Sequence, residues 1–154
     1  MLHAFIFGPI AVTVGYWVQR GVDTESGARV EIRRVAYDEI PGAPAGVAGL
    51  SLLPVSAGIW RADLFRDQNG SIIYHYHPHF EKGDVGERSL DDRLTADPVG
   101  WVMDRLGELR AVLIDSGAGD IAGEVPYADV GLALPSIREA IVASFDPPPG
   151  EGAG

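Results

Sequence analysis

The chain has 154 residues, no cysteine and a formal net charge of −10, and 46% of its residues are hydrophobic. This length is typical of one domain, and the lack of cysteine excludes disulfides and thiolate metal sites. No run of basic residues offsets the negative charge, so the composition argues against nucleic-acid binding. Cytoplasmic residence is the simplest localisation for a chain without cysteine.

The N-terminal residues 2–18 contain no Asp, Glu, Lys or Arg. A membrane-spanning helix needs about 20 apolar residues, and this run is shorter and is interrupted at Gly8-Pro9. It also lacks the positively charged start of a signal peptide. Its β-branched and aromatic residues instead predict one or two buried strands with a break at Gly8-Pro9. We therefore expect no membrane association.

The next segments predict a second strand, a loop and an apolar piece of undetermined type. Residues 29–37 are the strand, with a bulge near Arg33-Arg34. Residues 40–49 are rich in Pro, Gly and Ala, which is typical of a surface loop. The short apolar piece follows at residues 50–54.

Residues 59–66 and 71–80 predict a β-hairpin, because the Asn69-Gly70 dipeptide between them readily adopts the positive φ angles of a tight turn. A turn of two or four residues would place Trp60, Ala62 and Leu64 beside the histidine-bearing face of the second strand. A loop of three or five residues would instead place Arg61, Asp63 and Phe65 there. The Asn-Gly dipeptide favours the first register, which puts Asp63 on the core side.

The second half of the chain predicts helices. Residues 81–96 are charged and irregular, with one helical turn near 90–94. Asp97-Pro98 is a good helix start, and apolar residues then recur at helical spacing to residue 116. A second helix is predicted over 135–145.

Strands followed by helices predict an α+β fold in one domain, residues 1–146. We expect an antiparallel sheet of about four strands over residues 3–80, with two C-terminal helices packed on one face. The Pro/Gly-rich tail, residues 147–154, is expected to be disordered.

The segment Tyr74-His75-Tyr76-His77-Pro78-His79 carries the chemistry that the sequence offers. Because side chains alternate along a strand, the three histidines share one face and the two tyrosines share the other, more apolar face. His75 and His77 lie about 6.6 Å apart along a strand and can converge on one metal, whereas His75 and His79 lie about 13 Å apart. Pro78 ends the strand or lies at an edge, so His79 is at the rim.

This pattern predicts His75, His77 and His79 as candidate ligands of a divalent transition metal such as Zn. The further ligand candidates are His3, Glu81 and Asp84, with Asp63 only in the second hairpin register. Two alternatives stay open. The imidazoles could bond to neighbouring Asp, Glu or backbone groups without a metal, or they could serve in ligand binding, proton transfer or pH sensing.

A first hypothesis for function is a metal-dependent, hydrolase- or lyase-like enzyme acting on a small molecule. His79 or Glu81 would be the third ligand or general base, and Tyr76 or Arg93 an auxiliary group.

A second hypothesis is a non-enzymatic interaction module, such as an inhibitor, an immunity-type protein or an accessory subunit. It rests on residues 81–129, which contain twelve acidic and five basic side chains. A third is a homodimer that uses the aromatic N-terminal strands as its interface.

Overall fold

The computed structural model describes residues 2–39, 48–52, 58–81 and 83–150. The elements follow in the order β1 (Leu2–Phe7), β2 (Ile10–Gln19), β3 (Glu25–Glu39), β4 (Ala48–Leu52), β5 (Gly58–Asp67), β6 (His75–His77), β7 (Phe80–Glu81), β8 (Asp84–Val85), α1 (Asp92–Ala96), α2 (Pro98–Gly107), α3 (Leu109–Asp115), the 3-10 helix η2 (Ala122–Glu124) and α4 (Tyr127–Ala143). No helix in this part of the chain is long and apolar enough to cross a membrane.

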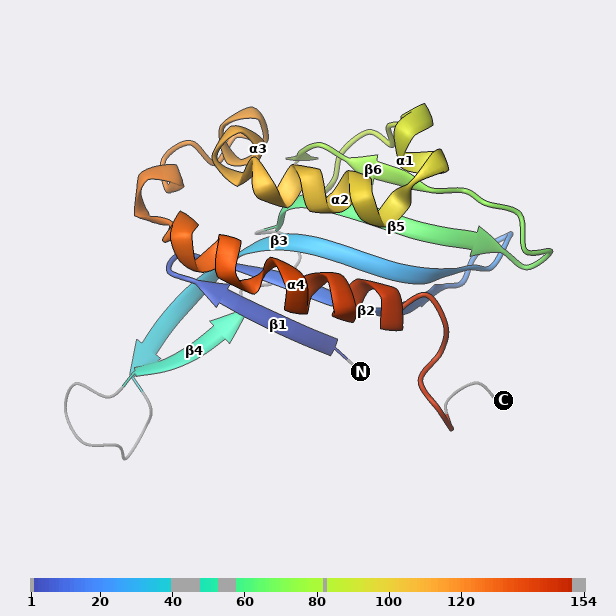
Figure 1. Ribbon diagram of the computed structural model, residues 1–154, viewed down its shortest axis with the longest axis horizontal. Coiled ribbons are helices and arrows are strands. Elements are labelled where there is room, and N and C mark those ends of the chain that lie inside the picture. Colours follow the sequence, from blue (N-terminus) through green and yellow to red (C-terminus); the bar gives the residue numbers. More distant parts are fainter. Residues whose placement is uncertain (1, 40–47, 53–57, 82, 151–154) are drawn as a thin grey trace.

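Six strands form one antiparallel sheet. Five of them follow the spatial order β1-β2-β3-β5-β6, and the sixth, β4, branches off β3. Strand β4 pairs with the distal part of β3, and together they project from the body of the molecule (Figure 1). Strands β7 and β8 form a separate two-stranded ribbon. The α+β class and the antiparallel sheet are confirmed, and the sheet has two strands more than expected.

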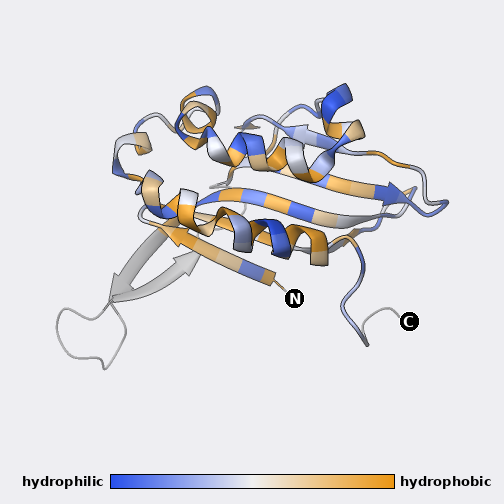
Figure 2. Ribbon diagram, viewed as in Figure 1, coloured by the Kyte–Doolittle hydropathy of each residue, from blue (hydrophilic) through white to orange (hydrophobic). Residues whose placement is uncertain are grey.

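The helices cover one face of this sheet, as predicted (Figure 1). Apolar and polar residues alternate along β3 and β5, so that each strand offers one apolar face (Figure 2). Cross-strand rows such as Val14–Val30–Ala62 are fully buried beneath the helices. Trp60 ends the next row and stacks on Trp101 of α2, with ring centroids 6.0 Å apart.

The N-terminal half follows the sequence pattern closely. The break at Gly8-Pro9 is the turn between β1 and β2. The bulge expected near Arg33 appears as a register shift between Ile32 and Arg33 where β3 pairs with β5. The undetermined apolar piece contributes to β4. Most of the predicted loop, residues 40–47, lies outside the described residues. Residues 151–154 of the predicted tail lie outside them as well.

The helices depart from the predicted boundaries. The Asp97 carboxylate accepts a hydrogen bond from the Gly100 N–H at 3.0 Å, so the predicted N-cap is confirmed, but the helix breaks at Glu108 into α2 and α3. The predicted start of the second helix at Pro135 is wrong, because α4 begins at Tyr127 and Pro135 lies inside it. Burial of Val130 on the side of α4 that packs on the core outweighs the one backbone hydrogen bond that a proline removes.

Candidate metal centre

The turn between β5 and β6 sets which residues face the histidines. The loop has three residues, 68–70, and ends on Gly70 with φ +82°. The Gly70 N–H donates to the Asp67 carbonyl at 3.0 Å, and the Asp67 carboxylate accepts from the N–H groups of Asn69 and Ser71 at 2.8 and 2.9 Å. This is a turn followed by a left-handed glycine, the usual form of a three-residue hairpin loop.

The third loop residue makes the predicted hairpin register wrong. Asp63 pairs with His75, and Arg61 pairs with His77. Because the side-chain period of a strand is two, one extra loop residue moves Asp63 from the expected core side to the histidine face. The Asn69-Gly70 dipeptide favours a turn of two or four residues, whereas the Asp67 carboxylate bonds the N–H groups of a three-residue loop.

Asp63, His75 and His77 form what we call the aspartate–histidine cluster. The Asp63 Oδ2 atom lies 3.2 Å from the His75 Nε2 and 3.6 Å from the His77 Nε2. One ligand atom from each of the three side chains lies within 4.8 Å of the other two. The residues are 1%, 1% and 6% exposed, so the cluster is closed to bulk solvent.

The outer nitrogens of both imidazoles are bonded to the backbone. The His75 Nδ1 lies 2.8 Å from the Ile73 carbonyl oxygen, and the His77 Nδ1 lies 3.0 Å from that of Gly86. A carbonyl can only accept, so each Nδ1 carries the hydrogen and donates it. The backbone thus binds one nitrogen of each imidazole and leaves both Nε2 atoms directed at one carboxylate, so the arrangement fits the metal-bound and the metal-free alternatives.

When both imidazoles are neutral, three acceptor atoms meet at one point. In a neutral imidazole with Nδ1–H, the Nε2 atom has a lone pair, and the Asp63 Oδ2 atom has lone pairs as well. Each Nε2–Oδ2 approach needs a proton or a cation between the two atoms. A metal-bound histidine commonly has this arrangement, with its second nitrogen donating to a carbonyl.

Arg29 fixes the other oxygen of the Asp63 carboxylate. Its Nε donates to Oδ1 at 2.7 Å, and its guanidinium lies between the rings of Trp17 and Phe65, at 4.9 and 5.2 Å from their centroids. Burial raises the pKa of Asp63. Without a metal ion, a hydrogen between Oδ2 and each Nε2 lets His75 and His77 donate to the carboxylate, and these hydrogen bonds with the charge of Arg29 outweigh burial. The pKa of this carboxyl lies well below its ordinary value.

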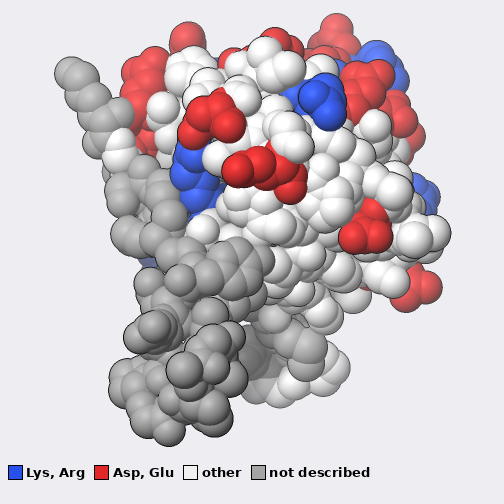
Figure 3. All heavy atoms as spheres, turned by 90° about the vertical axis from the view of Figure 1, so that its left-hand side faces the viewer, with Lys and Arg blue, Asp and Glu red and all other residues white. Residues whose placement is uncertain are grey.

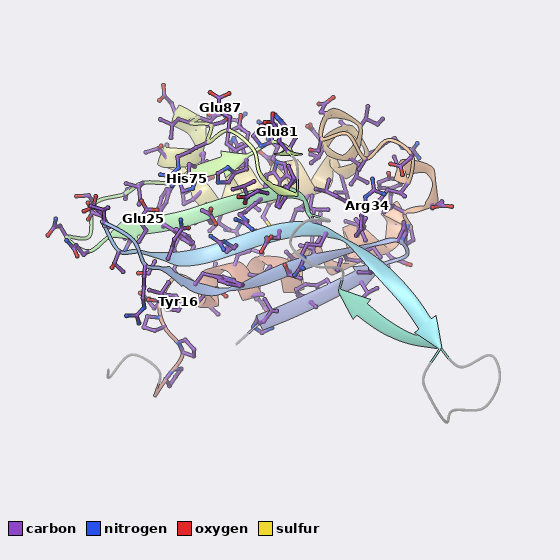
Figure 4. The ribbon with its side chains drawn as sticks, turned by 180° about the vertical axis from the view of Figure 1, so that it is seen from behind. Tyr16, Glu25, Arg34, His75, Glu81 and Glu87 are labelled. Carbon is purple, nitrogen blue, oxygen red and sulfur yellow. The ribbon has the colours of Figure 1, made fainter. Side chains whose placement is uncertain are left out.

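A second buried ion pair lies beside the cluster. Arg61 donates from NH2 to the Glu31 carboxylate at 3.1 Å, and the two residues are 7% and 4% exposed. Cross-strand pairing produces two polar rows on this face, Gly15–Arg29–Asp63–His75 and Thr13–Glu31–Arg61–His77. Seen from behind, this face is turned away from the helices (Figure 4).

The segment after β6 folds back over part of this polar face. The Phe80 ring lies 5.4 Å from the Arg61 guanidinium, and the Gly86 carbonyl holds His77. Ser89 exchanges two backbone hydrogen bonds with Tyr76, of 2.8 and 3.0 Å, along the outer edge of β6. A Cβ atom added at Gly86 would lie 2.6 Å from the His79 carbonyl oxygen, so this close approach requires glycine.

The remaining histidine and acid candidates lie away from the cluster. The His79 Nε2 pairs with Glu81 at 2.8 Å, with 41% and 66% of the two side chains exposed. His3 is on β1, with β2 and β3 between it and β5. Asp84 accepts from the Val85 N–H within the β7–β8 ribbon.

The auxiliary candidates are not brought to the histidines either. Tyr76 lies on the helix-covered face, 4.8 Å from the Trp101 ring centroid. Arg93 is in α1, with 76% of its side chain exposed, and pairs with Asp104 at 3.2 Å.

The described part of the acidic region, residues 81 and 83–129, includes the end of β7, β8, the helices α1 to α3, η2 and the start of α4. At the end of the molecule that includes α3 and η2, acidic groups lie in separate clusters with basic groups between them (Figure 3). One ion pair there joins the Arg34 guanidinium to the Asp120 carboxylate, with NH2 and Oδ1 3.0 Å apart. The interaction-module hypothesis stays a prediction.

Several surface pockets of the described residues lie elsewhere. One with an aromatic wall, about 240 Å³, is between β5, β6 and the α2–α3 break, on the helix-covered side. None of the four pockets is lined by Asp63, His75 or His77. Comparison with protein-family models, with curated proteins and with solved structures finds no match.

Proposed function

We propose that this protein binds one divalent transition-metal ion at the aspartate–histidine cluster, and that the ion fastens strand β6 to β5. The observation that carries the proposal is the convergence of three acceptor atoms, Asp63 Oδ2 and the two Nε2 atoms, on one buried point. Two neutral imidazoles and one carboxylate suit zinc, and also iron, nickel or copper.

The spacing of the acceptor atoms supports an ion between them. Zinc lies about 2.0–2.2 Å from nitrogen and oxygen ligands, so two ligands at tetrahedral positions are about 3.3–3.5 Å apart. The two Nε2–Oδ2 distances, 3.2 and 3.6 Å, are close to this value. Arg29 and the two carbonyls hold the three ligands from outside, which is the support that metal ligands usually receive.

The burial of the cluster favours a structural ion. Catalytic zinc sites keep a coordination position open to substrate, whereas structural sites are closed. Because the three side chains are almost fully buried, the hydrolase- or lyase-like chemistry predicted from the sequence is not part of this proposal.

The ion would join parts of the fold that are otherwise weakly connected. Strand β6 has only three residues, and Asp63 on β5 faces two of them. Through the His77–Gly86 hydrogen bond, the ion would also hold the segment that covers the polar face. Binding to the folded state alone stabilises it by about 2.7 kcal/mol at a free metal concentration of 100 times Kd.

The test is zinc titration of the untagged protein after chelator treatment, by calorimetry and by thermal unfolding. We expect one zinc ion per chain and a higher Tm. His77→Gln removes a ligand atom, so it should abolish the Tm increase. His79→Gln is the matched control, because it removes an exposed imidazole two residues away that makes no contact with Asp63.

Two results would contradict the proposal. One is the absence of zinc binding by a folded wild-type protein. The other is equal zinc binding by the His77→Gln and wild-type proteins, with loss of binding in His79→Gln. Nickel and cobalt titrations of the same three proteins extend the test to other divalent metals that imidazole binds.

A further inference from the structure

We propose that the protein forms a two-fold symmetric dimer in which β1 pairs antiparallel with β1 of a second copy. The inference is independent of the metal ion. It rests on one juxtaposition: β1 is an edge strand that no other described strand pairs with on its outer side, and it carries no charged residue.

The two ends of the strand order β1-β2-β3-β5-β6 differ. At the β6 edge, Ser89 and Tyr76 exchange two backbone hydrogen bonds, so the edge is covered by the chain itself. At the opposite edge, β1 (Leu2–Phe7) pairs with β2 on one side, and none of the described strands pairs with its other side. Every second N–H and C=O group of β1 therefore points outward with no strand to bond.

Strand β1 lacks the features that normally keep an edge strand from pairing. Its six residues, LHAFIF, include no Lys, Arg, Asp, Glu or Pro, and its pairing with β2 is regular with no bulge. Leu2 and Ile6 are 52% and 37% exposed, and Ala4 between them is exposed as well. These three side chains lie on the same face of the sheet.

The chemistry of the strand fits a second copy of itself. The chain carries a net charge of −10, so most surfaces of two copies repel each other. Residues 2–18 carry no formal charge, so pairing of this strand with its copy opposes no like charges within the strand. Antiparallel pairing centred on Ala4 sets Leu2 against Ile6 of the second copy twice, which is the self-complementary arrangement of a two-fold interface.

The first experiment measures the mass of the untagged full chain in solution by light scattering over a range of concentrations. We expect about twice the 16.4-kDa chain mass. Ala4→Lys would set two like charges opposite each other on the symmetry axis, so it should raise the dimer dissociation constant by at least about tenfold. Val22→Lys is the matched control, because it adds the same charge at a fully exposed turn position and should leave the dimer intact.

The second experiment tests the register and uses the absence of cysteine. Directly opposed side chains of an antiparallel pair have Cβ atoms about 4.5–5.5 Å apart, close enough for mild oxidation to link cysteines there. The Ala4→Cys protein should give a disulfide-linked dimer much faster than the Val22→Cys protein. Circular dichroism of all four variants checks that each one is folded.

The dimer is contradicted by a monomer mass at every concentration of the wild-type protein. It is also contradicted by a dimer that Ala4→Lys leaves intact, or by equal cross-linking at the two cysteine positions. A dimer that Ala4→Lys breaks, with cross-linking confined to Ala4→Cys, supports pairing through β1 at the proposed register.

Discussion

The two faces of one sheet are both buried, and they are buried by different means. On the helix-covered face, rows such as Val14–Val30–Ala62 are apolar and pack beneath α2 and α4. On the opposite face, the rows Gly15–Arg29–Asp63–His75 and Thr13–Glu31–Arg61–His77 carry charges that are almost as well buried. Alternation along β3 and β5 produces both faces from the same two strands, each face from every second residue.

The comparison teaches what each face needs from its neighbours. An apolar side chain gains from leaving water whatever it touches, so the apolar face depends on volume and close packing. A buried charge is stable only when a partner neutralises it and satisfies its hydrogen bonds. The polar face meets this need with opposite charges on adjacent strands: Arg29 beside Asp63, and Glu31 beside Arg61. It therefore depends on register, and one shifted residue would undo it.

Placing a charge on the apolar face should lower the free energy of unfolding the most. Leu64→Asp would bury a carboxylate without a cation beneath the helices, at a position that is now 0% exposed. We expect a loss above about 5 kcal/mol, enough to unfold a typical domain. Circular dichroism and urea unfolding measure the loss, with Leu64→Met as the control that should cost less than about 1.5 kcal/mol. A folded Leu64→Asp protein with a wild-type midpoint would show that the apolar face is not required.

Breaking one ion pair on the polar face should cost somewhat less. Glu31→Gln leaves the Arg61 guanidinium buried without its carboxylate, and we expect a loss of about 3 kcal/mol. The double change Glu31→Leu with Arg61→Met removes both charges and should cost less than the single change. The buried Arg61 Nε has no hydrogen-bond partner among the described residues, and Arg61→Met removes this unsatisfied donor. Urea unfolding of the wild type, Glu31→Gln and the double variant measures the three free energies of unfolding. A double variant less stable than Glu31→Gln would contradict this expectation.

Acid should weaken the polar face more than the apolar face. Because the pKa of Asp63 is lowered in the folded protein, its carboxylate contributes stability at pH values above its ordinary pKa of 3.8. That contribution is lost progressively as the pH falls below this value toward the lower folded pKa, with a slope of up to about 1.4 kcal/mol per pH unit. Unfolding in metal-free buffer at pH 5, 4 and 3 should show a shallower slope for Asp63→Asn than for wild type. Equal slopes would show that Asp63 does not contribute to the loss of stability at low pH.

The loop that sets the register should show the smallest effect. Gly70→Ala places a side chain at φ +82°, and we expect a loss of about 1 kcal/mol. Gly21→Ala is the control, because Gly21 lacks a positive φ and an added Cβ would come no closer than 3.8 Å to a neighbour. A Gly70→Ala protein as stable as the control would show that the left-handed residue is not what fixes the loop.

Hydrophobic periodicity was sufficient to predict the apolar face. The β1–β2 break at Gly8-Pro9, the helix start at Asp97 and the strand face carrying Tyr74 and Tyr76 all follow from local patterns whose physical cause lies within a few residues. Helix α4 was missed at its start because the gain from burying Val130 arises from tertiary packing, which a local rule about Pro135 does not include.

The candidate site could be predicted only in part. The His75–His77 pair is local and was visible in the sequence, whereas Asp63 joins them only in one of two hairpin registers. The signal that could have chosen the register is Asp67, whose carboxylate caps the N–H groups of a three-residue loop. Arg29 lies 34 residues from Asp63 in sequence, and no local pattern links the two.

The most direct measurement is anomalous X-ray diffraction at the zinc absorption edge from crystals soaked in zinc. If the aspartate–histidine cluster holds the ion, we expect one strong peak in the anomalous difference map. It should lie about 2.0–2.2 Å from the Asp63 Oδ2 and from the Nε2 atoms of His75 and His77. A peak beside His79 and Glu81, or the absence of a peak at the cluster at saturating zinc, would contradict it.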